Sequence, residues 1–140
     1  MTPVWFVDTN VVIDVLTARP PFFAEARVVF EAARQGQVRL VTTITSLATA
    51  YYIGCRATHD AQLTTRVLRE LTKLLTIAPA TDAIVAEALV TDWPDFEDAL
   101  QYFAARATPA VSAIITRDPA GFQLGLLPVL SPAAALQQLT

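Results

Sequence analysis

The 140-residue chain is 54% hydrophobic and 16% charged, which predicts a folded core and excludes the composition of a disordered protein. Its net charge of −3 argues against broad nonspecific binding to nucleic acid. The chain has no apolar run of membrane-spanning length and no secretion signal, so a membrane protein is excluded. With one cysteine (Cys55) and one histidine (His59), the usual zinc sites are excluded as well. We therefore expect a single domain over residues 1–140 in the reducing cytoplasm.

The first half of the chain alternates short apolar runs with segments of helical periodicity. Val4–Val7 reads as a buried strand that ends at Asp8, and we expect Thr9 or Asn10 to cap the helix that follows. The next predicted elements are a helix over Phe22–Gln35 closed by Gly36, a strand over Val38–Val41, a helix through Tyr51 to about Arg56, and a helix over Ala61–Leu75.

The second half continues this alternation. The predicted elements are a short strand over Leu75–Ala78, helices over Ile84–Val90 and Phe96–Ala107, strands over Val111–Ile115 and Pro128–Leu130, and a closing helix capped by Ser131. Strands that alternate with helices predict an α/β fold in which helices cover both faces of a parallel sheet. In such sheets ligands bind beyond the carboxyl ends of the strands.

Acidic side chains stand where this rule places a site. Asp8 ends the first strand and Asp118 follows a later one, while Asp95 and Asp98 open a helix and share a face of it, with Glu97 expected to point elsewhere. Converging carboxylates repel one another unless a cation neutralises them, and Mg²⁺ or Mn²⁺ suits an all-oxygen site. A water on such an ion can attack a phosphodiester.

Each aspartate also has a purely structural interpretation. Asp95 is a good N-cap, Asp98 suits the first turn of a helix, and Asp118 before Pro119 is typical of a turn. Asp8 is harder to explain in this way, because a carboxylate that closes an apolar strand is costly unless it is used. Three aspartates at one end of a single sheet favour a site over three separate structural roles.

The motifs around these aspartates resemble a known family. Val7–Leu16 (VDTNVVIDVL) closely resembles the opening motif of PIN domains, the fold of many bacterial (VapC-like) toxin ribonucleases of toxin–antitoxin pairs. Asp98-Ala99-Leu100 is similar to the central acidic motif of the family, and Ile115–Asp118, with Phe122 four residues on, looks like the late one. The likeness covers about Val4 to Leu130 and implies a three-layer α/β/α PIN-like fold with a central, mostly parallel sheet.

The resemblance also implies a function. It implies Mg²⁺- or Mn²⁺-dependent cleavage of RNA by the toxin component of a toxin–antitoxin pair, with a homodimer and inhibition by a small antitoxin protein. Carried over to this sequence, the metal ligands are Asp8, Asp98 and Asp118, and their polar neighbours are Asn10 and Thr116. Arg117 either contacts phosphate or forms a surface salt bridge.

The sequence departs from the family at one position. PIN domains usually carry a glutamate on the third helix, but the corresponding segment here is Ser46-Leu47-Ala48-Thr49, so that Thr49 stands in its place as a neutral, weaker ligand. One interpretation is that Asp95, or Glu97, supplies the missing charge, with Asp95 in the better helical position. The alternative is a catalytically weak or inactive PIN-like module that binds RNA or a protein partner.

A phosphatase or phosphotransferase with Asp8 as nucleophile is disfavoured. Such enzymes typically need a second acid two residues later, where this chain has Asn10, and a well-placed lysine, whereas Lys73 lies on a mid-chain helix. The four scattered glycines exclude a nucleotide-binding P-loop.

Overall fold

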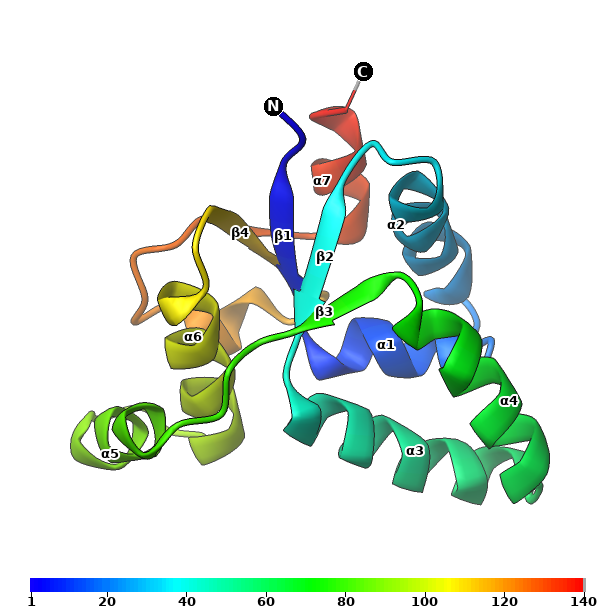
Figure 1. The fold of residues 1–140 in the computed structure, drawn as a ribbon, viewed down its shortest axis with the longest axis horizontal. Helices are drawn as coiled ribbons and strands as arrows, with labels where there is room; N and C mark the ends of the chain where they lie inside the picture. The colour runs from blue at the N-terminus through cyan, green and yellow to red at the C-terminus, as the bar shows by residue number, and fades with distance from the viewer. Residues whose placement is uncertain (140) are drawn as a thin grey trace.

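Five parallel strands form the central sheet of the computed structural model, which describes residues 1–139 (Figure 1). Their order is β3-β2-β1-β4-β5, so that β1 lies in the middle. All four pairs of neighbours are parallel, which confirms the α/β fold class. The strands are β1 (Val4–Val7), β2 (Arg39–Thr42), β3 (Leu75–Ile77), β4 (Val111–Ile115) and β5 (Val129–Leu130).

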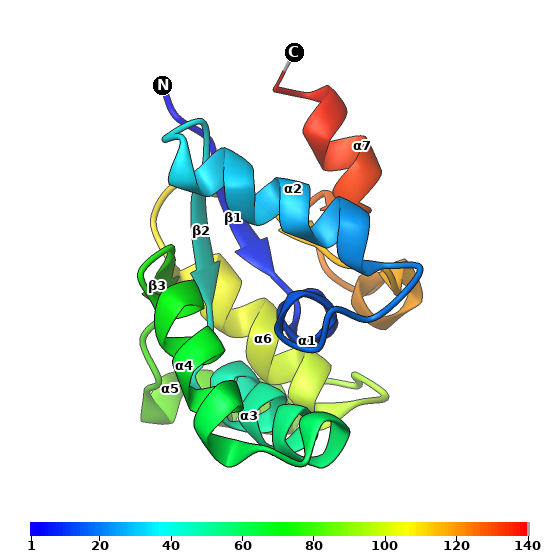
Figure 2. The same ribbon diagram turned by 90° about the vertical axis from the view of Figure 1, so that its right-hand side faces the viewer.

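Helices cover both faces of the sheet and give it three layers (Figures 1 and 2). Trp5 and Val7 of β1 face one core, whereas Val4 and Phe6 face the other, because successive side chains of a strand point to opposite sides. The helices are α1 (Thr9–Leu16), α2 (Phe23–Arg34), α3 (Ile44–Thr58), α4 (Ala61–Thr72), α5 (Asp82–Val90), α6 (Phe96–Ala107) and α7 (Pro132–Gln137), with a short 3-10 helix η1 (Pro119–Phe122).

The two cores differ in the helices that close them. On the side of Trp5, residues of α1, α2, α3, α4 and α7 contribute, and α3 and α4 form a hairpin beside α1. On the side of Phe6, residues of α5, α6 and η1 complete the core. The side chains of Trp5 and Phe6 are fully buried, and burial of each stabilises the fold by roughly 2–3 kcal/mol.

Side-chain caps explain where most helices begin. Thr43, Asp60, Thr81, Asp95 and Ser131 each accept a hydrogen bond from the backbone three residues later, as N-cap residues do. The expectation that Thr9 or Asn10 caps the first helix is wrong. Asp8 holds the N-cap position of α1 and its side chain makes no capping bond there.

The remaining differences from the predicted elements are shifts at their ends and one additional short helix. The helix expected to end near Arg56 continues to Thr58, where His59 adopts a left-handed backbone (φ 55°) and ends it. The short helix η1 was not predicted and replaces a simple turn after Asp118. Within residues 1–139, no helix combines the length and the apolar character required to cross a bilayer.

Parallel neighbours bring the ends of β1 and β4 together. Val7 is in register with Ile115, and the backbone N–H of Asp8 donates to the carbonyl of Ile115 (2.9 Å). The first residues beyond the two strands, Asp8 and Thr116, are therefore adjacent although they are far apart in the sequence. This edge of the sheet is where a ligand site is expected.

Candidate active site

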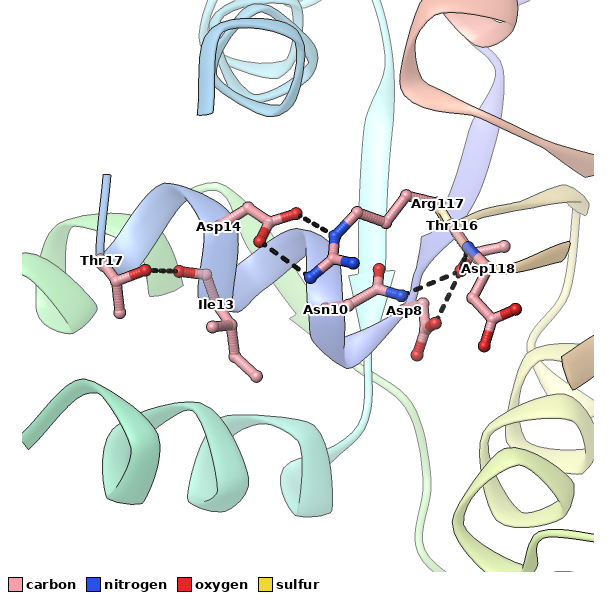
Figure 3. Close-up of polar contacts among 8 residues, drawn as sticks. All are labelled: Asp8, Asn10, Ile13, Asp14, Thr17, Thr116, Arg117 and Asp118. Atoms are coloured by element: carbon pink, nitrogen blue, oxygen red, sulfur yellow. Dashed lines mark hydrogen bonds and ion pairs between the residues drawn. The ribbon is translucent and has the colours of Figure 1, made fainter. Parts of the chain in front are cut away.

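Thr116 links three segments at the carboxyl edge of the sheet (Figure 3). Its hydroxyl donates to Oδ2 of Asp8 (2.7 Å) and accepts from the side-chain amide of Asn10 (3.3 Å) and from the backbone N–H of Asp118 (3.0 Å). Thr116 is completely buried and Asp8 nearly so, at 6% exposed. The Asp8 carboxylate is thereby held in place, and the first turn of the loop that carries Asp118 is tied to it.

A second polar network lies beside Asp8 and joins α1, α3 and α6. The Thr9 hydroxyl is 2.7 Å from Oγ of Ser46 and 3.0 Å from Oε1 of Glu97. The buried Gln101 accepts from the backbone N–H of Thr9 (3.1 Å) and from the Ser46 hydroxyl (3.3 Å). The expectation that Glu97 points away from the site is therefore wrong, because Glu97 and Gln101 are four residues apart on one face of α6 and both reach Thr9.

Asp98 approaches the site from the start of α6. A side-chain carbon at Gly121 would lie 2.6 Å from Oδ2 of Asp98, so only glycine in η1 allows the carboxylate to occupy this place. Asp95 caps α6 by accepting from the backbone N–H of Asp98 (2.9 Å) and is itself exposed. Asp95, Asp98 and Gly121 contribute to a cleft of about 530 Å³.

The carboxyl groups interact electrostatically. Burial is the main reason that the pKa of Asp8 is raised, the charge of Asp118 raises it further, and hydrogen bonds with Thr116 and Gln101 oppose the change. The pKa of Asp98 is raised to about 7 by burial and then by the charges of Asp95, Asp8, Asp118 and Glu97. A carboxyl group with such a pKa is only about half ionised at neutral pH unless a positive charge is supplied.

The oxygen donors at this edge of the sheet are of the type that a hard divalent cation prefers. Within residues 1–139, no three acidic, cysteine or histidine side chains are gathered as closely as the ligands of a bound metal. The available donors nevertheless suit Mg²⁺ or Mn²⁺, because they are carboxylate oxygens that repel one another. Beside them, Oδ1 of Asn10 is buried and makes no hydrogen bond in the described part of the chain, which leaves a neutral oxygen unused.

Arg117, the residue after Thr116, forms a salt bridge with Asp14 of α1 (Figure 3). Its guanidinium donates to both carboxylate oxygens of Asp14, at 2.7 and 3.3 Å, and lies 4.1 Å from the ring centroid of Phe22. Asp14 on α1 is almost fully buried, so this is a partly buried pair and not the surface salt bridge considered from the sequence. The contacts join the loop after β4 to α1 and occupy Arg117.

Thr49, which replaces the usual glutamate of the third helix, is only partly buried on α3. Its side chain makes no hydrogen bond to any of residues 1–139. The α3 residue that does reach the site is Ser46, one turn earlier.

Sequence reasoning missed Ser46 and Gln101. Ser46 was named only in the segment that ends at Thr49, and Gln101, one residue beyond Asp98-Ala99-Leu100, was not singled out. The available signal was the spacing of Glu97 and Gln101, which share a helix face with each other. A buried glutamine on an otherwise apolar helix face also needs polar partners.

The comparisons with known proteins agree with this architecture. A three-layer α/β/α fold with carboxylates at the edge of a parallel sheet is an arrangement found among nuclease-type proteins. The sequence model of the PIN domain matches residues 5–120, and the chain belongs to the PIN-domain family. Members of this family are generally nucleases that use divalent metals and act on RNA. No curated protein matches the chain.

Proposed function

We propose that this PIN domain is a metal-dependent endoribonuclease with Asp8, Asp98 and Asp118 as its metal ligands. The observation that carries the proposal is the meeting of three aspartates from separate parts of the chain at one edge of the sheet: Thr116 bonds both Asp8 and the backbone of Asp118, and the Asp98 carboxylate lies against Gly121, three residues after Asp118. The charges of Asp8 and Asp118 both act on Asp98, and that of Asp118 acts on Asp8. Mutual repulsion of this kind has no benefit for stability but is what a cation site requires.

The surrounding residues hold these ligands in position. Thr116 and Gln101 restrain the Asp8 carboxylate, and Gly121 leaves room for that of Asp98. The chemistry that a bound Mg²⁺ or Mn²⁺ supplies is a water of lowered pKa and positive charge beside the scissile phosphate. The cleft next to Asp98 provides space for a substrate at this edge of the sheet.

Glu97 is proposed as the fourth carboxylate, in place of the missing glutamate of α3. It is half-buried and contacts Thr9, the residue directly after Asp8. Asp95, which was preferred from the sequence, is exposed and already caps α6, although its charge also acts on Asp98. The geometry therefore favours Glu97 as a ligand or as a base toward the bound water, with Asp95 as an additional negative charge.

The test is cleavage of RNA by the purified protein with Mn²⁺ or Mg²⁺ added. We expect cleavage to disappear with EDTA and in Asp8→Asn, while circular dichroism shows that the variant is folded. Asp60→Asn is the matched control, since it removes one charge at a cap far from the site and Asn caps helices as well as Asp does. Cleavage that survives EDTA or Asp8→Asn would refute the proposal.

The position of Thr49 favours one alternative, a catalytically weak module that binds RNA or a protein. Without a carboxylate on α3, the site has fewer negative charges toward a cation. Calorimetric titration separates the two functions. No binding of Mn²⁺ at millimolar concentration supports the module, whereas binding that Asp8→Asn and Asp98→Asn abolish supports the nuclease.

We further propose that the protein is a toxin component that acts in the cytoplasm under the control of a small antitoxin. Support comes from the resemblance to toxin ribonucleases and from a lone cysteine, which suits a reducing compartment. Expression from an inducible promoter is expected to arrest growth, and Asp8→Asn is expected to relieve the arrest. The antitoxin is then sought among small proteins that restore growth when they are co-expressed.

We also propose that the protein forms a homodimer through α5. Apart from Asp82 and Glu87 this helix consists of apolar residues, yet Val85, Leu89 and Val90 are exposed, and exposed apolar side chains on such a helix are normally covered. Light scattering after size-exclusion chromatography is expected to give twice the monomer mass, and Leu89→Glu to give the monomer. A monomeric wild-type protein would reject the dimer without affecting the nuclease assignment.

A further inference from the structure

A pocket of about 300 Å³ lies between α3 and α4, outside the carboxylate site. Arg66 and Arg69 line it from the exposed side of α4, together with Gln62 and Thr65, and Tyr51 lines it from α3. The Thr65 hydroxyl donates to the Tyr51 hydroxyl (3.3 Å), which connects the two walls. The pocket thus offers two guanidinium groups and several neutral hydrogen-bonding groups.

The two arginines are not used within the fold. The structure, which describes residues 1–139, gives neither Arg66 nor Arg69 an ion pair or a side-chain hydrogen bond. The exposed cations Arg34 and Lys73 differ, since Arg34 is paired with Glu31 and Lys73 with Glu70. Two unpaired guanidinium groups one turn apart on a helix can meet one anion together.

The hairpin around the pocket is basic in an acidic protein. Residues 44–73 carry four cations and two acidic residues, in a chain whose net charge is −3. The rest of the molecule, including the carboxylate site, is correspondingly more negative. Attraction of a polyanion to this protein is therefore concentrated on the α3–α4 hairpin.

We propose that this pocket binds a backbone phosphate of the RNA strand, away from the bond that is cut. The inference rests on the proposed ribonuclease function, and the pocket would hold the RNA substrate that the acidic site by itself repels. Helix α3 begins beside Asp8, where Ser46 contacts Thr9, and Tyr51 lies five residues later, which is roughly 8 Å along the helix axis. An RNA strand that passes the carboxylates can follow α3 to Arg66 and Arg69.

RNA fits these groups better than an acidic protein segment does. Five of the six side chains that line the pocket carry hydrogen-bonding groups, and its apolar parts are Ala61, the Tyr51 ring and the stems of the polar side chains, so it suits a small charged group better than a large apolar side chain. Guanidinium pairs bind phosphate oxygens in a bidentate way. Anchoring one phosphate here also offsets the repulsion between the RNA and the aspartates.

The experiment measures binding of a fluorescent single-stranded RNA in EDTA, where cleavage does not occur. We expect Arg66→Gln/Arg69→Gln to weaken binding by about tenfold at low salt and, because one phosphate contact is lost, to reduce the slope of log K against log salt by about 0.7. Arg27→Gln/Arg34→Gln removes the same charge from α2 and is expected to have a much smaller effect. The two arginines changed in each variant are exposed, and thermal melts verify that both variants fold.

Several outcomes would overturn the proposal. The first is that the wild-type protein does not bind RNA, and the second is that the α2 control loses as much RNA affinity as the pocket variant. The third is that polyglutamate competes for the pocket while RNA binding does not depend on Arg66 and Arg69. Inorganic phosphate tests whether a single phosphate group suffices, and displacement of RNA by millimolar phosphate is the expected result. RNA binding that depends on the pocket, without cleavage in Mn²⁺, would keep this inference and reject the ribonuclease.

Discussion

The hydroxyl of Thr116 donates a 2.7 Å hydrogen bond to the carboxylate of Asp8, across a sequence separation of 108 residues. Both residues directly follow neighbouring strands of the sheet, β4 and β1, so the strand register itself brings them together. The same hydroxyl oxygen accepts from Asn10 and from the backbone of Asp118. One buried oxygen therefore fixes the relative positions of two proposed metal ligands.

Loss of this hydroxyl should disturb the site more than it disturbs the fold. We expect Thr116→Val to raise the pKa of Asp8 further, because the hydrogen bond lowers it, and to weaken Mn²⁺ binding by roughly tenfold or more. The unfolding free energy is expected to fall by about 1–3 kcal/mol, since buried partners lose their hydrogen bond. Calorimetric titration with Mn²⁺ and chemical denaturation measure the two effects.

Two controls separate metal binding from stability in that experiment. Thr116→Ser keeps the hydroxyl and is expected to restore Mn²⁺ affinity. Thr42→Val removes another buried hydroxyl, which donates to the carbonyl of Val7, and should lower stability without changing Mn²⁺ affinity. Equal Mn²⁺ affinity in Thr116→Val and Thr42→Val would show that Thr116 is only structural.

Glu97 and Asp95 are distinguished by amide variants that keep shape and remove charge. Glu97→Gln is expected to lower Mn²⁺ affinity and the cleavage rate by about tenfold, because the number of charged ligands controls cation affinity. Asp95→Asn is expected to change both much less, and to leave stability unaltered because asparagine caps helices as well as aspartate does. A larger loss in Asp95→Asn would assign the fourth carboxylate to Asp95.

The raised pKa of Asp98 predicts a dependence of stability on pH in the absence of metal. Between pH 3.8, the ordinary value, and about 7, this carboxyl loses its proton in the unfolded chain but keeps it in the folded protein. The folded state binds more protons there, so the unfolding free energy should decrease as pH rises through this range and level off above it.

Chemical denaturation in EDTA at pH 4, 5.5 and 7 measures this trend. Asp98→Asn lacks the titrating group and is expected to show a smaller decrease than the wild-type protein. Saturating Mn²⁺ at pH 7 should stabilise the wild-type protein more than Asp98→Asn. Parallel pH profiles for the two proteins in EDTA would contradict the expected role of Asp98.

The pair formed by Arg117 and Asp14 should contribute to stability. Arg117→Ala leaves the nearly buried Asp14 without its partner and removes the contact with Phe22, so we expect a loss of about 3 kcal/mol in unfolding free energy. Arg34→Ala breaks a more exposed pair, whose side chains are 66% and 33% exposed, and should have little effect. Urea denaturation measures the unfolding free energies of the two variants. Arg117→Ala is also expected to reduce cleavage activity, because it loosens the loop that carries Asp118. A stable but inactive Arg117→Ala would instead support a direct contact with RNA.

The fold class could be predicted from the sequence because its signals are local. Apolar runs such as Val4–Val7 followed by helical periodicity predict a parallel α/β sheet, and the polar residues Asp8 and Asp118 mark the ends of two strands. The motifs around these residues also led to the family that the match over residues 5–120 confirms. Caps such as Asp95 and Ser131 were identifiable because capping needs only a residue and the backbone three positions later.

The partners of each site residue were decided only by tertiary structure. Whether Arg117 contacts phosphate or a carboxylate, and whether Glu97 points toward Thr9 or away, depends on how α1, α6 and the loop after β4 pack together. The same packing made Gln101 and Ser46 part of the site and left Thr49 outside its hydrogen bonds. Hydrogen bonds and charge interactions act over a few ångströms in space, whereas the sequence orders residues along the chain. Contacts across 55 to 103 positions are therefore set by the register of strands and the packing of helices.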